Sequence, residues 1–212
     1  MNLRVYEIFR SIQGESTRAG QPCAFVRLSG CDAHCSYCDT PQAQDPASGR
    51  NITVLEIVAT VKQLGEPVVE ITGGEPMLQP EGVMALASRL LDMGHTVMLE
   101  TNGCHDLSAL DPRIEIVMDV KTPGSGLVGQ LHEANIDVLD GNDEVKFVLT
   151  GREDYEWARE FIAERPQIMA VRAIHFSPVW DSLPAAALAA WLREDGGPAR
   201  LAVQLHKLLG VR

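Results

Sequence analysis

Residues 68–100 read VVEITGGEPMLQPEGVMALASRLLDMGHTVMLE, a segment in which two short apolar runs flank a longer one. The runs at 68–72 and 96–100 have the length and composition of buried strands. The segment from about 81 to 93 is predicted to be a helix, which Gly94 ends. A strand, a crossover helix and a second strand predict two parallel neighbours in one sheet.

The same alternation extends outward in both directions. Thr53 and Glu56 form a capping-box pattern that begins a helix, and Gly65 and Pro67 end it. Further strands are predicted at residues 1–10, 22–29, 114–120, 145–149, 171–176 and 201–205, further helices at 153–164 and 185–192, and a mobile glycine-rich loop at 124–129. The chain has 212 residues, fewer than the roughly 250 of a full eight-fold barrel. We therefore expect an α/β fold, a partial TIM-like barrel of mostly parallel strands with fewer helices than a full barrel.

Composition restricts the classes of partner. The chain carries 29 Asp and Glu residues against 18 Lys and Arg, a net charge of -11 at pH 7. Direct binding of nucleic acid needs clustered basic residues, so we expect none. No apolar run is long enough to span a bilayer and no secretory signal is visible, so we expect no membrane partner and a cytoplasmic location.

Three of the five cysteines crowd into eight residues, as Cys31, Cys35 and Cys38. Thiolates are soft ligands that suit iron–sulfur clusters, zinc and Cu(I). A structural zinc site with His34 or a distant residue as fourth ligand is one alternative, although no second cluster of ligands follows. On a four-iron cluster, three cysteines would leave one iron open for catalysis. The two remaining cysteines are expected to be small buried residues.

Chemically unusual residues follow the predicted strands. In sheets of this kind, ligands sit at the carboxyl ends of the strands. The residues found there are Cys31, Gly73-Gly74, Glu100, Lys121 and Ser177. We therefore expect one ligand site along this edge.

The C-x3-C-x2-C spacing, with Tyr37 just before the third cysteine, resembles the radical S-adenosylmethionine (SAM) superfamily. Gly73-Gly74-Glu75-Pro76 strengthens the resemblance, although such residues are also ordinary in a turn that ends a strand. The resemblance implies a single radical SAM domain over residues 1–212, with a cluster loop at about 30–50 and a C-terminal extension at about 200–212. In the superfamily, three cysteines hold a 4Fe-4S cluster, SAM chelates the open iron, and reductive cleavage of SAM gives a 5'-deoxyadenosyl radical.

Further segments resemble the 7-carboxy-7-deazaguanine synthase family. They are EIF at 7–9, SIQGE at 11–15, FVR at 25–27, GC at 30–31, YCDT at 37–40, TGGEP at 72–76, ETNG at 100–103 and QLHK at 204–207. The family, a group of carbon–nitrogen lyases in queuosine biosynthesis, converts 6-carboxy-5,6,7,8-tetrahydropterin to 7-carboxy-7-deazaguanine with ring contraction and release of ammonia. The resemblance also implies Mg²⁺, a homodimer, and an external electron donor of the flavodoxin or ferredoxin type.

Two other functions remain open at this point. One is a radical SAM activase that makes a glycyl radical on a partner enzyme, against which the segments at 13–15 and 204–207 weigh. The other is a zinc-bound interaction module without catalysis.

Site residues follow by position from the family resemblance. Those expected at the substrate are Ile12, Gln13, Gly14, Arg27 and Thr72. Those expected at SAM are Tyr37, Cys38, Asp39, Gly74, Glu100, Asp119, Val120, Lys121, Phe176, Ser177, Pro178 and Val179. Arg27 should grip the substrate carboxylate, because its planar fork makes two charge-assisted bonds. Thr40 is the expected magnesium ligand, and the substrate must complete the shell because this ion needs six hard oxygens.

Two segments depart from the family's pattern. Asp119-Val120-Lys121 stands where relatives often have Ser-Pro-Lys, and the segment 176–179 stands where some have Gln-Pro-Met. Both are expected to approach the cofactor mainly by their backbone. Some relatives end in a proline whose carboxylate touches substrate, and here Arg212 ends the chain. Without the family context, Thr40 would be an ordinary cap before a proline and ETNG an ordinary Asn-Gly turn.

Overall fold

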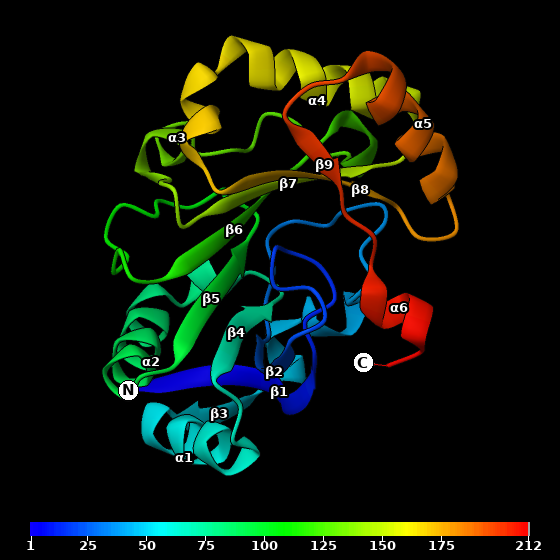
Figure 1. The fold of residues 1–212 in the computed structure, drawn as a ribbon. Helices are drawn as coiled ribbons and strands as arrows, with labels where there is room; N and C mark the ends of the chain where they lie inside the picture. The colour runs from blue at the N-terminus through cyan, green and yellow to red at the C-terminus, as the bar shows by residue number, and fades with distance from the viewer. Residues whose placement is uncertain (212) are drawn as a thin grey trace.

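The predicted alternation of strands and helices is present in the structure (Figure 1). The computed structural model describes residues 1–211, so Arg212 lies outside the described residues. The strands are β1 (Asn2–Ile12), β2 (Pro22–Leu28), β3 (Arg50–Thr53), β4 (Val68–Gly73), β5 (Thr96–Thr101), β6 (Glu115–Val120), β7 (Glu144–Leu149), β8 (Ala173–Pro178) and β9 (Ala199–Leu201). The α-helices are α1 (Val54–Leu64), α2 (Pro80–Asp92), α3 (Asn135–Val138), α4 (Arg152–Glu164), α5 (Ala185–Asp195) and α6 (Leu205–Leu209). Short 3-10 helices are η1 (Pro41–Ala43), η2 (Pro46–Ser48), η3 (Pro76–Leu78), η4 (Pro123–Ser125) and η5 (Pro166–Ala170).

Within residues 1–211 the strands form one nine-stranded sheet, in the order β3-β1-β2-β4-β5-β6-β7-β8-β9. Neighbours from β2 to β9 run parallel, whereas β1 runs antiparallel to β2 and β3. Figure 1 shows the sheet curling, with α1 and α2 outside its lower half and α4 and α5 outside its upper half. Because β3 and β9 are separate edges, the barrel stays open, and the described α-helices are fewer than the strands. The predicted partial barrel is therefore confirmed.

Alternation along the strands separates an apolar face from a polar one. On β4, Ile71 joins the core beneath the helices, whereas Glu70 and Thr72 face the other side and line a cavity. On β7, Phe147 lies in the core and Lys146 lines the cavity. One face of the sheet therefore packs, and the other supplies polar side chains for a site.

The capping box at the start of α1 is formed as predicted. Thr53 Oγ1 accepts a hydrogen bond from Glu56 N (3.2 Å), and Glu56 Oε2 accepts one from Thr53 N (2.9 Å). The helix then buries Ile57 and Val61 and ends at Gly65, whose φ of 75° is left-handed. The cap and the glycine fix where this helix packs on the sheet.

Replacing Thr53 with alanine is expected to lower the free energy of unfolding by about 1 kcal/mol, the usual cost of a lost N-cap. Urea denaturation of the wild-type and variant chains measures the difference. Thr53→Ser keeps a hydroxyl at the cap and serves as the control. Equal stability of the alanine and serine variants would contradict a role for the cap.

The strand predicted at 201–205 is wrong for residues 202–205. In the structure β9 ends at Leu201, and the short helix α6 begins at Leu205. Ala202 N donates to Phe176 O (2.9 Å), which is the last backbone bond to β8. Leu205 N then donates to Gly14 O (2.8 Å) in the loop after β1. The chain leaves the sheet to make this long-range contact, which local strand propensity does not encode.

The segment at 124–129, predicted to be mobile, is anchored at its start by η4. Gly124 N donates to Asp154 Oδ1 on α4 (2.7 Å). Ser36 N, in the cysteine-containing loop, donates to Ser125 O (3.1 Å). The glycines therefore permit a tight turn between α4 and the cysteine loop.

A loop at residues 13–21 joins β1 to β2 and reaches across the open side of the barrel (Figure 1). Thr17 N donates to Glu144 Oε2 on β7 (2.9 Å). Arg18 forms a bidentate ion pair with Glu115 on β6, in which Nη2 donates to Oε1 (2.6 Å) and Nε donates to Oε2 (2.7 Å). The loop thus supplies a wall that a complete barrel would take from further strands.

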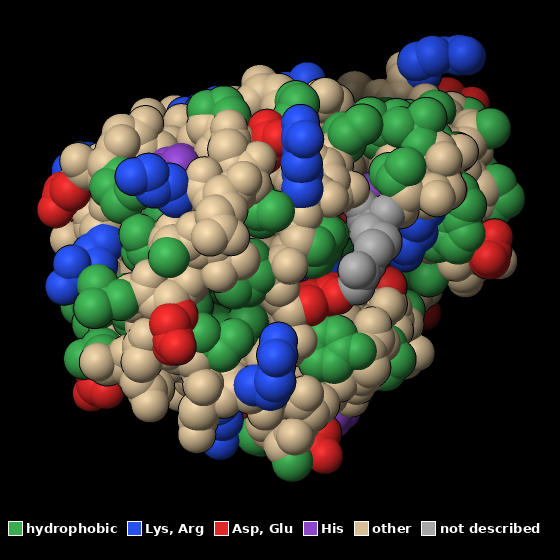
Figure 2. All heavy atoms as spheres, turned by 90° about the horizontal axis from the view of Figure 1, so that it is seen from below, with side chains coloured by type: hydrophobic (Ala, Val, Ile, Leu, Met, Phe, Trp, Pro, Cys, Tyr) green, Lys and Arg blue, Asp and Glu red, His purple; other side chains and the backbone are tan. Residues whose placement is uncertain are grey.

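None of the helices in the described part of the chain is long and apolar enough to cross a membrane. Figure 2 shows Lys and Arg side chains scattered among acidic and apolar ones on the face turned toward the viewer. Among the described residues of that face, the basic side chains form no continuous band of the kind that binds phosphate backbones.

Candidate active site

A cavity of about 600 Å³ opens at the carboxyl ends of the parallel strands. It brings together most of the residues singled out in the sequence. Those that line it are Ile12, Gln13, Gly14, Arg27, Cys31, Tyr37, Cys38, Asp39, Thr40, Thr72, Gly74, Glu100, Asp119, Lys121 and Val179. The expected substrate residues and most of the expected SAM residues thus share one space.

Five of the expected residues do not line this cavity. They are Cys35, Val120, Phe176, Ser177 and Pro178. The side chains of Val120 and Phe176 belong to the core beneath the helices. Of these two residues, only the backbone could approach a ligand, whereas Asp119 and Lys121 line the cavity.

Cys31, Cys35 and Cys38 lie half-buried in the loop that follows β2. Cys31 N donates to Gln44 O (3.0 Å) and Cys38 N to Cys35 O (3.2 Å), so backbone bonds shape the loop. Burial raises the pKa of the Cys31 thiol to about 11, so this sulfur keeps its proton until a metal displaces it.

The spacing of the sulfurs tests the zinc alternative. Around one zinc ion, tetrahedral sulfurs at about 2.3 Å from the metal lie about 3.8 Å apart. Among the described residues, the three thiols do not form a group whose donor atoms all lie within 4.8 Å of one another. The three thiols therefore do not stand as a single zinc ion would hold them.

Gly73 and Gly74 bring the end of β4 against the end of β2. Gly74 N donates to Leu28 O (3.0 Å), and Glu75 N donates to Gly30 O (2.8 Å). A Cβ on either glycine would overlap backbone atoms of Leu28 or Gly30. The glycines therefore hold in place the segment that leads into Cys31.

The Glu75 side chain is fully buried and ties β4 to the ETNG segment after β5. Its carboxylate accepts hydrogen bonds from Met77 N (2.8 Å), Thr101 Oγ1 (2.8 Å) and Asn102 N (2.7 Å). Burial raises the pKa of Glu75, and these donors oppose the rise. The glutamate of the GGEP segment is therefore a structural tie between two ligand-facing segments.

Arg27 is held firmly at the cavity wall. Its Nε donates to Glu7 Oε1 (3.0 Å), its Nη1 donates to Thr40 Oγ1 (3.4 Å), and its guanidinium lies over the Phe9 ring (5.7 Å to the centroid). In the sheet it stands opposite Thr72. Two expected substrate residues and the expected magnesium ligand are thus neighbours.

Two buried polar atoms in the cavity wall have no hydrogen-bond partner within the described chain. They are Asn102 Nδ2 and Asp119 Oδ1. An unpaired buried polar group is costly, so such atoms point to a ligand that completes them. Asp119 was expected at SAM, whereas Asn102 was quoted only as part of the ETNG segment.

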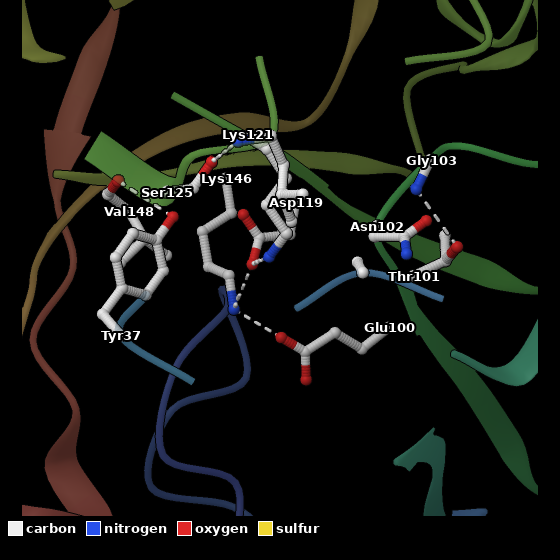
Figure 3. Close-up of polar contacts among 12 residues, drawn as sticks. Tyr37, Glu100, Thr101, Asn102, Gly103, Asp119, Lys121, Ser125, Lys146 and Val148 are labelled. Carbon is white, nitrogen blue, oxygen red and sulfur yellow. Dashed lines mark hydrogen bonds and ion pairs between the residues drawn. The ribbon is translucent and has the colours of Figure 1, made fainter. Parts of the chain in front are cut away.

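Sequence reasoning missed two charged groups on the cavity floor, Lys146 and Glu70. Lys146 Nζ pairs with Glu15 Oε2 (2.8 Å) and with Glu100 (Figure 3). Burial and the nearby Glu100 raise the pKa of Glu70 well above its usual range, and Gln13 donates a hydrogen bond to it. The alternation of side chains along β4 and β7 could have identified both residues, because it places them on the polar face of the sheet.

Comparisons with known proteins identify the family and the fold. A sequence profile of the radical SAM superfamily matches residues 25–165. A 7-carboxy-7-deazaguanine synthase of Chlorobaculum tepidum is 42% identical over 210 residues, covering 98% of this chain and 94% of that protein. A protein of the same name from Koribacter versatilis is 37% identical over 220 residues, covering 98% of this chain and 96% of its own. The crystal structure of QueE from Escherichia coli shares the fold, with a TM-score of 0.76 at 23% identity, covering 97% of this chain and 95% of the other.

Proposed function

The chain belongs to the 7-carboxy-7-deazaguanine synthase family of the radical SAM superfamily, and we propose that it converts 6-carboxy-5,6,7,8-tetrahydropterin to 7-carboxy-7-deazaguanine, with ring contraction and release of ammonia. One observation carries the proposal. The half-buried cysteine loop shares one cavity with Gln13, Arg27 and Thr72, the residues expected at a carboxylated pterin.

The superfamily implies a 4Fe-4S cluster and SAM, which together supply a 5'-deoxyadenosyl radical when bound. Cys31, Cys35 and Cys38 are proposed to hold the cluster. Asp119 Oδ1 lacks a partner within the described chain, which supports its expected place at SAM, and Asn102 Nδ2, which also lacks one, is added to the proposed SAM residues.

Arg27 is proposed to bind the substrate carboxylate. Its contacts with Glu7 and Phe9 order the guanidinium before substrate arrives, so little side-chain entropy is lost on binding. Ile12, Gln13 and Gly14, at the end of β1 and in the loop after it, would line the same cavity. The proposal also includes a homodimer and an external electron donor of the flavodoxin or ferredoxin type, both on the family resemblance alone.

Magnesium is proposed to bind at Thr40, and its affinity is expected to rise at least about tenfold when substrate is present, a difference of about 1.4 kcal/mol. Thr40 Oγ1 has Asp39 Oδ1 at 3.1 Å, but Lys207 already pairs with the Asp39 carboxylate (3.2 Å). Mg²⁺ needs six hard oxygen ligands, and Thr40 and Asp39 supply too few of them without substrate. Titration calorimetry with and without the pterin measures the difference, and equal affinities would contradict the assignment.

Anaerobic turnover tests the proposed function. Reconstituted protein is incubated with reductant, SAM, Mg²⁺ and 6-carboxy-5,6,7,8-tetrahydropterin, and the deazapurine is sought by ultraviolet spectrum and mass. Product formation that requires all four components is expected. Cleavage of SAM without deazapurine under every condition would contradict the proposal, and iron-free protein rich in zinc would contradict its cluster.

A further inference from the structure

Lys146 is a buried cation in the cavity to which the family resemblance assigns no role. It lies on the inward face of β7 and is 5% exposed. Its Nζ is 2.8 Å from Glu15 Oε2 and 3.9 Å from Asp119 Oδ2, and it also pairs with Glu100. Figure 3 shows the Lys146 side chain reaching toward Glu100 and Asp119. One ammonium group therefore serves three carboxylates from the loop after β1, from β5 and from β6.

The two nearest acidic residues connect Lys146 to residues expected at substrate, Glu100 through its carboxylate and Glu15 through its backbone N–H. Glu100 Oε2 accepts a hydrogen bond from Thr72 Oγ1 (3.2 Å). Glu15 N donates to Gln13 Oε1 (2.5 Å), and Glu15 Oε1 accepts from Gln204 Nε2 (2.9 Å). The network thus has Lys146 at its centre and the substrate residues Gln13 and Thr72 at its two ends.

Lys146 and Glu100 stabilise each other's charged forms. Burial lowers the pKa of Lys146, but Glu100, Glu15 and Asp119 outweigh that effect and raise it well above its ordinary value. Burial raises the pKa of Glu100, and Lys146 outweighs it, so the net shift is downward. A lysine that keeps its proton so firmly is a poor acid, which favours a role in holding its partners over a role in moving protons.

We propose that Lys146 is a positioning residue, which fixes Glu15 and Glu100 and through them holds Gln13 and Thr72 in place at the cavity wall. The inference rests on the proposed function, because only a pterin substrate gives Gln13 and Thr72 their roles. Removing one partner of a buried ion pair leaves an uncompensated charge, so Glu15 and Glu100 would move apart or take up water. Hydrogen transfer tolerates little displacement, since a shift of about 1 Å can lower a rate up to about 100-fold.

A purely structural role for Lys146 is the competing explanation, because Glu15 belongs to the loop at 13–21 that closes the barrel. Arg18 tethers the same loop to Glu115 on β6 and does not line the cavity. Arg18→Met therefore removes one tether of the loop through a side chain that lies outside the cavity. It is the matched control for Lys146→Met.

The test compares wild-type, Lys146→Met, Lys146→Arg and Arg18→Met proteins by two measurements. The first is the ratio of 5'-deoxyadenosine to deazapurine in anaerobic turnover, which reports whether the radical reaches its target. The second is the dissociation constant of the pterin, by equilibrium dialysis without SAM or reductant. In Lys146→Met we expect product formation to fall by about 10- to 100-fold, the ratio to rise, and pterin binding to weaken. Lys146→Arg should recover part of each effect, and Arg18→Met should keep the wild-type ratio even if it melts at a lower temperature.

Two results would overturn the inference. One is a wild-type ratio in Lys146→Met, and the other is an equal rise in Arg18→Met. If Lys146→Met does not fold, the double variant Lys146→Met with Glu15→Gln keeps the net charge of the network, leaves one stranded carboxylate fewer, and should still show the raised ratio. A wild-type chain that makes no deazapurine would contradict the proposed function itself, which distinguishes that failure from a failure of the Lys146 inference alone.

Discussion

Replacing Cys35 with alanine is expected to abolish cluster assembly and to lower turnover by more than about 100-fold, beyond what the loss of an outer-shell partner costs. The remaining cysteines, Cys31 and Cys38, can hold only two irons and leave a second one without a protein ligand. After anaerobic reconstitution, the variant should lack the iron, the sulfide and the visible absorbance of the wild-type protein. Iron and sulfide analysis of the two proteins, purified in parallel, measures the effect.

Cys104→Ala is the matched control for this experiment. Cys104 is half-buried and lies outside the triplet, and burial raises the pKa of its thiol to about 11. Cys104 follows β5 rather than β2 and does not line the cavity, so this variant should retain the cluster. Full iron in Cys35→Ala, or lost iron in Cys104→Ala, would contradict the assignment of the cluster to the triplet.

The segment at 68–100 shows how far local pattern predicts this fold. The structure places β4, α2 and β5 within one residue of the predicted ends, because each is decided by its own apolar residues and its own glycine or proline. The C-terminal segment shows where local pattern stops. Residues 202–205 leave the sheet because the loop at 13–21 offers them a partner, and that partner is about 190 residues away in the chain.

The site divides in the same way. Cys31 and Gly74 stand in contiguous motifs, so spacing alone singled them out, and strand order then placed them at one edge. The sequence analysis did not identify Lys146 and Asn102 as site residues, because a lysine in a strand and an asparagine in a turn are common in any protein. Lys146 stands out because it is buried among carboxylates, and Asn102 because its buried amide nitrogen has no partner within the described chain. Both environments form only when β5, β6 and β7 lie side by side in the sheet.

Gly74→Ala is expected to lower the free energy of unfolding of the cluster-free chain by about 2–4 kcal/mol, through overpacking and weakened hydrogen bonds. The added Cβ would overlap the carbonyl group of Gly30, which accepts the hydrogen bond of Glu75 N. Since Cys31 follows Gly30, iron incorporation should also fall. Urea denaturation of the apoprotein measures the stability, and iron analysis after reconstitution measures the cluster.

Gly141→Ala is the control, because its Cβ would meet only the carbonyl oxygen of Ala170, at an ordinary 3.8 Å. Its free energy of unfolding should stay within about 0.5 kcal/mol of wild type. The comparison separates two explanations for the glycine. A loss of stability in Gly74→Ala without SAM means that the glycine is needed to pack β4 against the segment before the cluster. Unchanged stability with lost SAM binding would instead mean that it is needed only to let a ligand approach the backbone. The overlap with Gly30 favours the first, so the glycine would serve the cofactor indirectly, by fixing where the first cysteine stands.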